Sequence, residues 1–156
     1  MAELKTRLQN DLTVAMKARE TVTAGALRMA LTAVTNEEVS GKQARELSDD
    51  EVVKVLTREA KKRKEAAEAF DGAGRAEKAE LERQELAVLE AYLPAQLDDA
   101  ALASIVDKAV EAVAAQLGEA PGPKQMGQVM KAVNAEVAGR AEGGRVAAAV
   151  KSRLAN

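Results

Sequence analysis

Residues 48–93 constrain the fold most, because they contain two long amphipathic segments joined by a turn that is rich in glycine. Ser48 and Glu51 form a capping box, in which each side chain accepts a hydrogen bond from a backbone N–H group at the start of a helix. Apolar residues at helical spacing then predict one buried face: Val52, Val53, Leu56, Ala60, Ala67 and Phe70. Glycines within residues 71–75 allow the chain to reverse. We therefore predict an antiparallel helical hairpin.

Two charged residues interrupt the apolar stripes of this hairpin. Arg63 projects among the apolar positions of the first segment, and Glu82 lies in a gap of the stripe that the second segment carries. Both are about equally far from Ala73, so an antiparallel arrangement brings them to the same level. An isolated charge in an apolar seam is unfavourable. We therefore predict an ion pair between Arg63 and Glu82; the alternative is that Arg63 extends its charged end to water.

The remaining periodic segments also predict helices and no strands. Helical spacing runs from Leu4 to about Arg19, then from Leu27 to a point before Gly41, with a break at residues 20–24. Further helices are expected after Asp98, where Gly118 stops the helix, then after Pro123 and near the C-terminal end. The predicted fold is all-α.

A domain boundary is expected at Tyr92-Leu93-Pro94, because proline disfavours helical geometry in the residue before it. We predict an N-terminal four-helix domain over residues 1–93, with the long hairpin at its centre. Residues 94–97 form a linker. Residues 98–156 form a small C-terminal three-helix bundle.

The composition excludes several classes of chemistry. The chain has no cysteine and no histidine, so it lacks a thiolate nucleophile, a disulfide framework and the most common general base. No phosphate-binding loop matches, and residues 139–144 are best read as a helix connection. Paired aspartates stand where helices are predicted to begin, where capping explains them. We therefore expect no catalytic residue, metal or cofactor. With no signal-peptide or membrane pattern, a cytoplasmic location is expected.

Charge is unevenly distributed along the chain. Residues 1–120 hold 17 Lys or Arg against 23 Asp or Glu, whereas residues 121–156 hold 6 against 2. A phosphate backbone would be attracted to this basic tail. Because the two aromatic residues both precede it, recognition of backbone and shape is expected rather than base stacking. The candidate nucleic-acid-binding residues are Lys124, Lys131, Arg140, Arg145 and Lys151, with Arg153 in the same tail. A basic helical bundle can also be merely solvated.

Several motifs together resemble the YqeY-like family over nearly the whole chain. They include Leu27-Arg28-Met29, Arg63-Lys64-Glu65-Ala66-Ala67, Tyr92-Leu93-Pro94, Met126-Gly127-Gln128-Val129-Met130-Lys131 and Gly139-Arg140-Ala141-Glu142-Gly143. The C-terminal half is similar to the tail domain of the B subunit of the glutamine-dependent tRNA amidotransferase. That resemblance implies a tRNA-related helical module that contacts tRNA or an aminoacyl-tRNA complex, without a catalytic centre of its own. Glu142 replaces the aspartate that is more usual in the family.

Two residues of these motifs have a physical interpretation besides the family one. Gly127 within a helix costs about 1 kcal/mol against alanine, so we expect it to permit close approach of another helix, with Met130 filling the gap. The functional alternatives are a protein-interaction module that docks through exposed apolar helix faces and, ranked last, a carbon-nitrogen ligase with glutamine as amide donor. The ligase is ranked last because no nucleophile with an activating group is evident.

Overall fold

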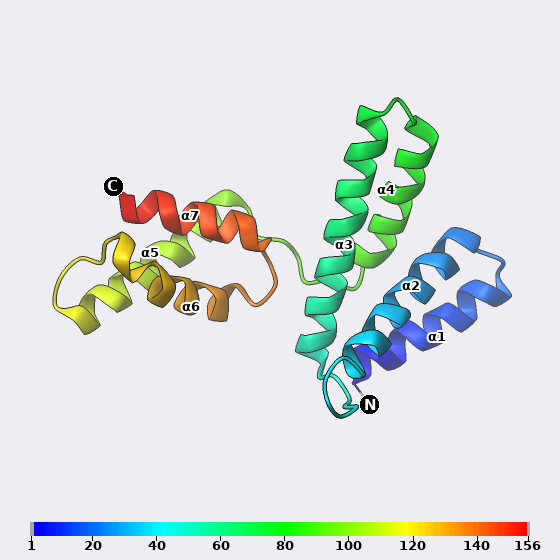
Figure 1. The fold of residues 1–156 in the computed structure, drawn as a ribbon, viewed down its shortest axis with the longest axis horizontal. Helices are drawn as coiled ribbons and strands as arrows, with labels where there is room; N and C mark the ends of the chain where they lie inside the picture. Colours follow the sequence, from blue (N-terminus) through cyan, green and yellow to red (C-terminus); the bar gives the residue numbers. More distant parts are fainter. Residues whose placement is uncertain (1, 156) are drawn as a thin grey trace. The chain divides into compact units, whose positions relative to one another are not determined.

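The computed structural model describes residues 2–155, and all regular elements in that part of the chain are helices (Figure 1). It contains seven α-helices and one short 3-10 helix among the described residues. The predicted all-α class is confirmed. The chain divides into two compact units, and the division falls between Leu93 and Pro94. None of the described helices has the length and apolar character needed to cross a membrane.

The N-terminal unit contains four helices. Their bounds are α1 (Glu3–Lys17), α2 (Thr21–Glu38), α3 (Asp49–Gly72) and α4 (Ala76–Glu90). Helices α3 and α4 form the predicted antiparallel hairpin, α2 packs against both of them, and α1 packs mainly against α2 (Figure 1). The tight turn of the hairpin places Gly74 in the left-handed region, with φ at 72°, where glycine carries no steric penalty.

The core of this unit consists of aliphatic side chains from all four helices and from the segment before α3. Fully or almost fully buried members are Leu8, Leu27, Val34, Leu47, Val52, Val55, Leu56 and Leu89. Val53 and Phe70, which the periodicity placed on the buried face, are only half-buried. Val55 is buried in addition to Val52 and Leu56, because α3 is covered by α2 as well as by α4 and its buried face is therefore wider than one stripe.

The C-terminal unit contains three α-helices around a separate core. Its elements are α5 (Asp99–Leu117), the 3-10 helix η1 (Pro123–Gln125), α6 (Met126–Val137) and α7 (Gly143–Ala155). Asp98 caps α5 by accepting a 2.7 Å hydrogen bond from the Ala101 N–H group. The core is built chiefly from valine: Leu102, Val106, Val110, Val113, Val129, Val133, Val137, Val146 and Val150. These small branched side chains fill the space between short helices in few rotamers.

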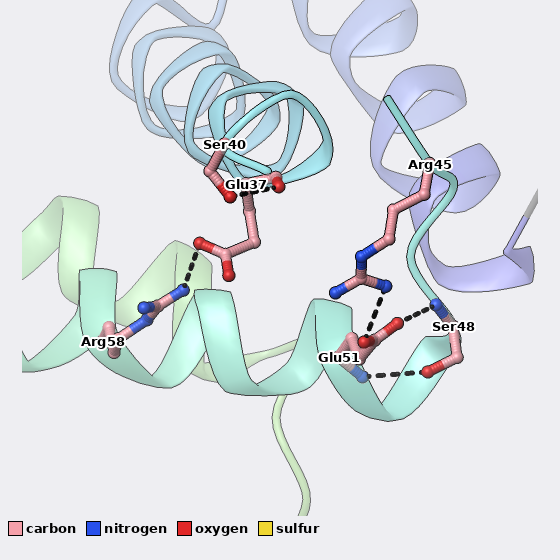
Figure 2. Close-up of polar contacts among 6 residues, drawn as sticks. All are labelled: Glu37, Ser40, Arg45, Ser48, Glu51 and Arg58. Carbon is pink, nitrogen blue, oxygen red and sulfur yellow. Dashed lines mark hydrogen bonds and ion pairs between the residues drawn. The ribbon is translucent and has the colours of Figure 1, made fainter. Parts of the chain in front are cut away.

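Figure 2 shows the polar contacts that hold the start of α3. The Ser48 hydroxyl accepts from the Glu51 N–H group at 3.3 Å, and the Glu51 carboxylate accepts from the Ser48 N–H group at 2.9 Å. The predicted capping box is therefore present. Arg45 adds an ion pair of 2.8 Å to Glu51. The hydrogen bond from the Ser48 backbone, followed by the contact with Arg45, lowers the pKa of Glu51.

The connection between α2 and α3 is tied down by contacts that local sequence patterns do not reveal. Arg58 on α3 contacts Glu37 at 3.1 Å, and the Ser40 hydroxyl donates to the Glu37 carbonyl (Figure 2). The neighbouring Glu38 is buried and accepts a 2.6 Å hydrogen bond from Lys5 on α1. That hydrogen bond is the main reason that the pKa of Glu38 is lowered. Glu38 thus joins α1 to the end of α2.

The break between α1 and α2 is shorter than predicted. Helix α1 ends at Lys17 rather than near Arg19, and α2 begins at Thr21, inside the stretch assigned to the break. The chain reverses within three residues because Arg19 adopts a left-handed conformation with φ at 58°. An arginine seldom adopts such a conformation, and the turn contains no glycine or proline. The turn is therefore not marked by its sequence.

We expect Ser48→Ala to lower the free energy of unfolding of the N-terminal unit by about 1 kcal/mol, the usual effect of losing an N-cap side chain. Urea denaturation followed by far-ultraviolet circular dichroism measures the change. Thr35→Ala, at an exposed position within α2, is the matched control and should leave stability unchanged or slightly higher. A Ser48→Ala midpoint equal to that of the control would contradict the role of the cap.

Candidate functional site

The C-terminal unit carries the predicted nucleic-acid-binding residues. Its predicted lysines have no side-chain partner in the described part of the chain, whereas its arginines are bonded to other groups of the unit. Lys124 lies in η1, Lys131 in α6 and Lys151 in α7, and all three are exposed. None of the three side chains makes an ion pair or a hydrogen bond with another described residue. Lys131 lies between the buried Val129 and Val133, on the side of α6 that faces away from the core. These ammonium groups are available to a ligand.

Arg140 is used to close the end of α6. Its Nε atom donates to the Val137 carbonyl at 3.0 Å, and its Nη2 atom donates to the Glu136 carbonyl at 2.7 Å. The last carbonyls of a helix have no partner within the helix, and a guanidinium there is favoured by the helix dipole. Arg140 therefore has a structural role, with its Nη1 group left over.

Arg145 and Arg153 both attach α7 to the part of the unit that precedes α6. Arg145 Nη2 donates to the Leu97 carbonyl at 3.0 Å and to Asp99 at 2.9 Å. Arg153 Nε donates to Asp107 on α5 at 2.9 Å. Two of the six cations of the basic tail are thus paired with acids that lie outside the tail.

Within the whole C-terminal unit, the charge of the basic tail is balanced. Residues 94–156 hold seven Lys or Arg and seven Asp or Glu, because α5 and its flanks are acidic. The C-terminal bundle as a whole is therefore not positively charged, and only part of its surface can attract a polyanion. Among the described residues of the unit, the lysines without a side-chain partner are Lys124, Lys131 and Lys151 on the basic tail and Lys108 on α5. Lys108 lies on the same helix as the exposed Glu111 and close in sequence to the exposed Glu119, which offset its charge.

Gly127 does not admit another helix of this chain. It lies exposed in the first turn of α6, and a Cβ atom built there would have no neighbour within 4 Å. The interpretation of Gly127 as a site of close helix approach is therefore wrong. Met130 fills no gap beside it and instead packs against the core of the C-terminal unit. The first turn of α6 faces away from α5 and α7 at this position.

A second polar cluster lies in the N-terminal unit, in the seam of the hairpin. Arg63 Nη1 is 3.3 Å from Glu82 Oε2 and 3.5 Å from Glu85 Oε2. The predicted Arg63–Glu82 pair is present, and the sequence reasoning missed Glu85. Arg63 also contacts the Met29 sulfur on α2 at 3.7 Å. One guanidinium thus serves two carboxylates at the place where three helices meet.

Two buried polar atoms in the seam lack a hydrogen bond within the described part of the chain. Arg63 Nε and Glu82 Oε2 are both buried, and neither has a hydrogen-bond partner among the described residues. Burial, and then the nearby charge of Glu82, raise the pKa of Glu85, and Arg63 offsets this only in part. The two carboxylates and the one guanidinium leave a net negative charge in the half-buried seam, and this charge favours protonation of Glu85.

Tyr92 anchors the end of the hairpin to α1. Its hydroxyl donates to Asp11 at 2.6 Å, and the Arg7 guanidinium lies 4.7 Å from the centre of its ring. Burial, followed by the hydrogen bond to Asp11, raises the pKa of Tyr92 to about 12. Pro94 comes two residues later, at the start of the C-terminal unit. Tyr92 thus fixes the point at which the chain leaves the N-terminal unit.

The described side chains provide few arrangements suited to catalysis or metal binding. No group of three or more acidic residues in residues 2–155 could hold a metal ion. The paired aspartates lie at helix starts, where Asp98 serves as a cap and Asp49 accepts from the Leu4 N–H group. The strongest chemical feature for an external ligand is therefore the set of unpaired lysines.

Comparison with known proteins supports the resemblance seen in the sequence motifs. The family model described as Yqey-like protein matches residues 5–154, a range that includes both units. No curated protein matches the chain. The family resemblance predicted from the motifs is thereby confirmed over nearly the whole chain.

Glu85→Gln tests the charge imbalance in the seam. A carboxyl whose pKa is raised in the folded state destabilises that state at neutral pH, and the loss is recovered as pH falls through the folded pKa towards the unfolded one. Glu85→Gln should therefore raise the unfolding free energy at pH 7, by roughly 0.5 kcal/mol after allowance for solvent screening. It should also flatten the pH dependence of stability between about pH 7 and the usual glutamate pKa near 4.3. Urea denaturation across pH measures both effects, with the exposed Glu90→Gln as control. A wild-type pH profile in Glu85→Gln would rule out this account.

Titration of the tyrosine tests the anchor directly, because the chain has one tyrosine and no tryptophan. The native phenol should ionise with a pKa of about 12, compared with about 10 for an unperturbed tyrosine. Asp11→Asn should lower this pKa, since it removes the negative charge that disfavours the phenolate. Tyrosinate absorbance gives the titration, and circular dichroism at each pH checks that the helices persist. Ionisation near pH 10 in the folded protein would mean that the anchor is absent.

Proposed function

Because the chain belongs to the Yqey-like family, whose model matches residues 5–154, we propose that it is a tRNA-binding module. The C-terminal unit would hold the phosphate backbone of the tRNA, alone or within an aminoacyl-tRNA complex. The module contributes binding, and any chemistry on the tRNA belongs to a partner. The similarity of this half to the tail domain of an amidotransferase subunit supports the choice of tRNA.

The observation that carries this proposal is the set of unpaired lysines in the C-terminal unit. Lys124, Lys131 and Lys151 are exposed and have no side-chain partner among the described residues. Lys131 lies six residues before the end of α6, and Lys151 lies eight residues after the start of α7. Helices α6 and α7 pack against each other (Figure 1), so the proposal assigns both lysines to one phosphate-binding surface.

The kinds of residue present favour backbone contacts over reading of bases. Residues 94–156 contain no aromatic side chain on which a base could stack. A lysine ammonium group acts as a compact point charge, whereas bidentate recognition of a base edge is chiefly the work of arginine. Arg140 can add one further phosphate contact through Nη1, because its Nε and Nη2 atoms are already bonded to carbonyls.

The acidic side of the unit sets the direction and the strength of binding. Glu111 and Glu119 on and after α5 are exposed, and they repel a polyanion. The ligand is therefore expected to approach α6 and α7. With about three cations engaged and no net charge on the unit, affinity should be modest and strongly dependent on salt.

Salt-dependent binding of tRNA tests the proposal. With about 0.9 counterions released per neutralised phosphate, three lysine contacts predict a slope of roughly −2.7 in a plot of log affinity against log salt concentration. Affinity should then fall about 40-fold between about 50 and about 200 mM salt. Each of Lys124→Gln, Lys131→Gln and Lys151→Gln should reduce the magnitude of the slope by about 0.9. Fluorescence anisotropy of labelled tRNA measures these slopes.

Lys108→Gln is the matched control, because Lys108 is an exposed lysine on α5 of the same unit. It should leave both affinity and slope unchanged. A tRNA affinity that responds to neither salt nor the three substitutions would defeat the proposal. Co-purification of a defined protein without any RNA would instead favour the protein-interaction function.

A further inference from the structure

The segment that links the two units is anchored on both sides by leucines. Leu93 packs against the core of the N-terminal unit, and Leu97 packs against the core of the C-terminal unit. Tyr92 strengthens the first anchor through its hydrogen bond to Asp11. Between the anchors lie the three residues 94–96, where the Gln96 side chain donates a local hydrogen bond to the Pro94 carbonyl at 3.3 Å.

The second anchor depends on the backbone of Leu97. Its N–H group donates to the Arg140 carbonyl at 2.7 Å, and its carbonyl accepts from Arg145 at 3.0 Å. Arg140 lies just before α7 and Arg145 lies in its first turn, so both partners are more than forty residues further along the chain. The anchor therefore exists only when the C-terminal unit is folded around it.

Arg145 is placed to hold the two ends of one short segment at once. The same Nη2 atom reaches the Leu97 carbonyl and the Asp99 carboxylate, which flank the N-cap residue Asp98. The Asp99 side chain is 99% exposed, so this ion pair is screened by water and can exchange readily. The hydrogen bond from a charged guanidinium to the carbonyl is the stronger contact of the two.

We propose that Arg145 is a clasp that sets the length of the joint between the two units. When the clasp is closed, the joint consists of residues 94–96. When Arg145 releases Leu97 and Asp99, Leu97 is held only by its N–H bond to the Arg140 carbonyl and by its packing against the core. When these weakened contacts open, the joint extends to Asp98, where the capped first turn of α5 begins. The clasp thereby controls how freely the C-terminal unit moves on its tether, whatever ligand that unit binds.

Arg153 provides a matched control for this proposal. It also lies on α7, it also pairs with an aspartate that belongs to α5, and its N···O distance of 2.9 Å equals that of the Arg145–Asp99 pair. It does not contact the linker. Arg145→Gln and Arg153→Gln therefore remove the same charge and the same kind of ion pair, and only the first opens the clasp.

Two measurements on the full chain test the clasp. Amide exchange at Leu97, followed by NMR, should be about fivefold faster in Arg145→Gln than in Arg153→Gln, the effect of one typical hydrogen bond on a local opening equilibrium. Because the chain has no cysteine, spin labels can be attached at Ala69→Cys and Ala115→Cys, both exposed on helices. The distribution of distances between these labels should be broader in Arg145→Gln than in the labelled parent or in Arg153→Gln.

Each result decides the matter. Equal exchange rates and equal distance widths in the two variants would overturn the proposal. Faster exchange at Leu97 with an unchanged width would overturn it too, because Arg145 would then merely stabilise the start of α5. If Arg145→Gln loses helicity, Arg145→Lys replaces it. A lysine keeps the charge but cannot reproduce the guanidinium fork. The distance distribution of Arg145→Lys is therefore expected to be broader than those of the labelled parent and of Arg153→Gln.

Discussion

The packing of α3 against α4 is the interaction on which the N-terminal unit depends. The two helices bury aliphatic and alanine side chains along their length, and α2 then covers the surface that the hairpin creates. Apolar contacts of this kind do not by themselves specify how far one helix is shifted along the other. Arg63 contributes to the register, because its guanidinium contacts Glu82 and Glu85 in the observed alignment of the two helices. A half-buried charged group that loses these partners when the helices slide opposes the sliding.

In the C-terminal unit, the charged side chains fall into two groups: arginines that hold the unit together and lysines that remain available to a ligand. Arg140, Arg145 and Arg153 all bond to groups within the unit, whereas Lys124, Lys131 and Lys151 have no described partner. The division follows from chemistry. A guanidinium can hold several carbonyl and carboxylate oxygens in fixed directions, while an ammonium group on a flexible stem remains hydrated. Unpaired lysines are therefore what this unit offers to a phosphate backbone.

Some failures of the sequence interpretation have clear physical causes. The turn at Arg19 was missed because a left-handed arginine has no compositional marker. Gly127 was misinterpreted because the low helix propensity of glycine shows only that glycine is unfavourable at this position. It does not show that another helix packs closely there, and none of the described helices does. Glu85 was missed because the hairpin count aligned Arg63 with a single residue, whereas its long side chain reaches glutamates on two successive turns of the facing helix.

The sequence by itself determined the helices, the capped starts at Ser48 and Asp98, and the pairing of Arg63 with Glu82. These features depend on residues within a few positions of one another, or on a hairpin whose register can be counted from its turn. Only the tertiary structure decided which cations stay available. Arg145 and Arg153 each meet an aspartate 46 positions away, and such a contact exists only after α7 has packed against α5. Local spacing contains no information about that encounter, so the sequence could count the charges of this unit but could not tell which of its cations are paired.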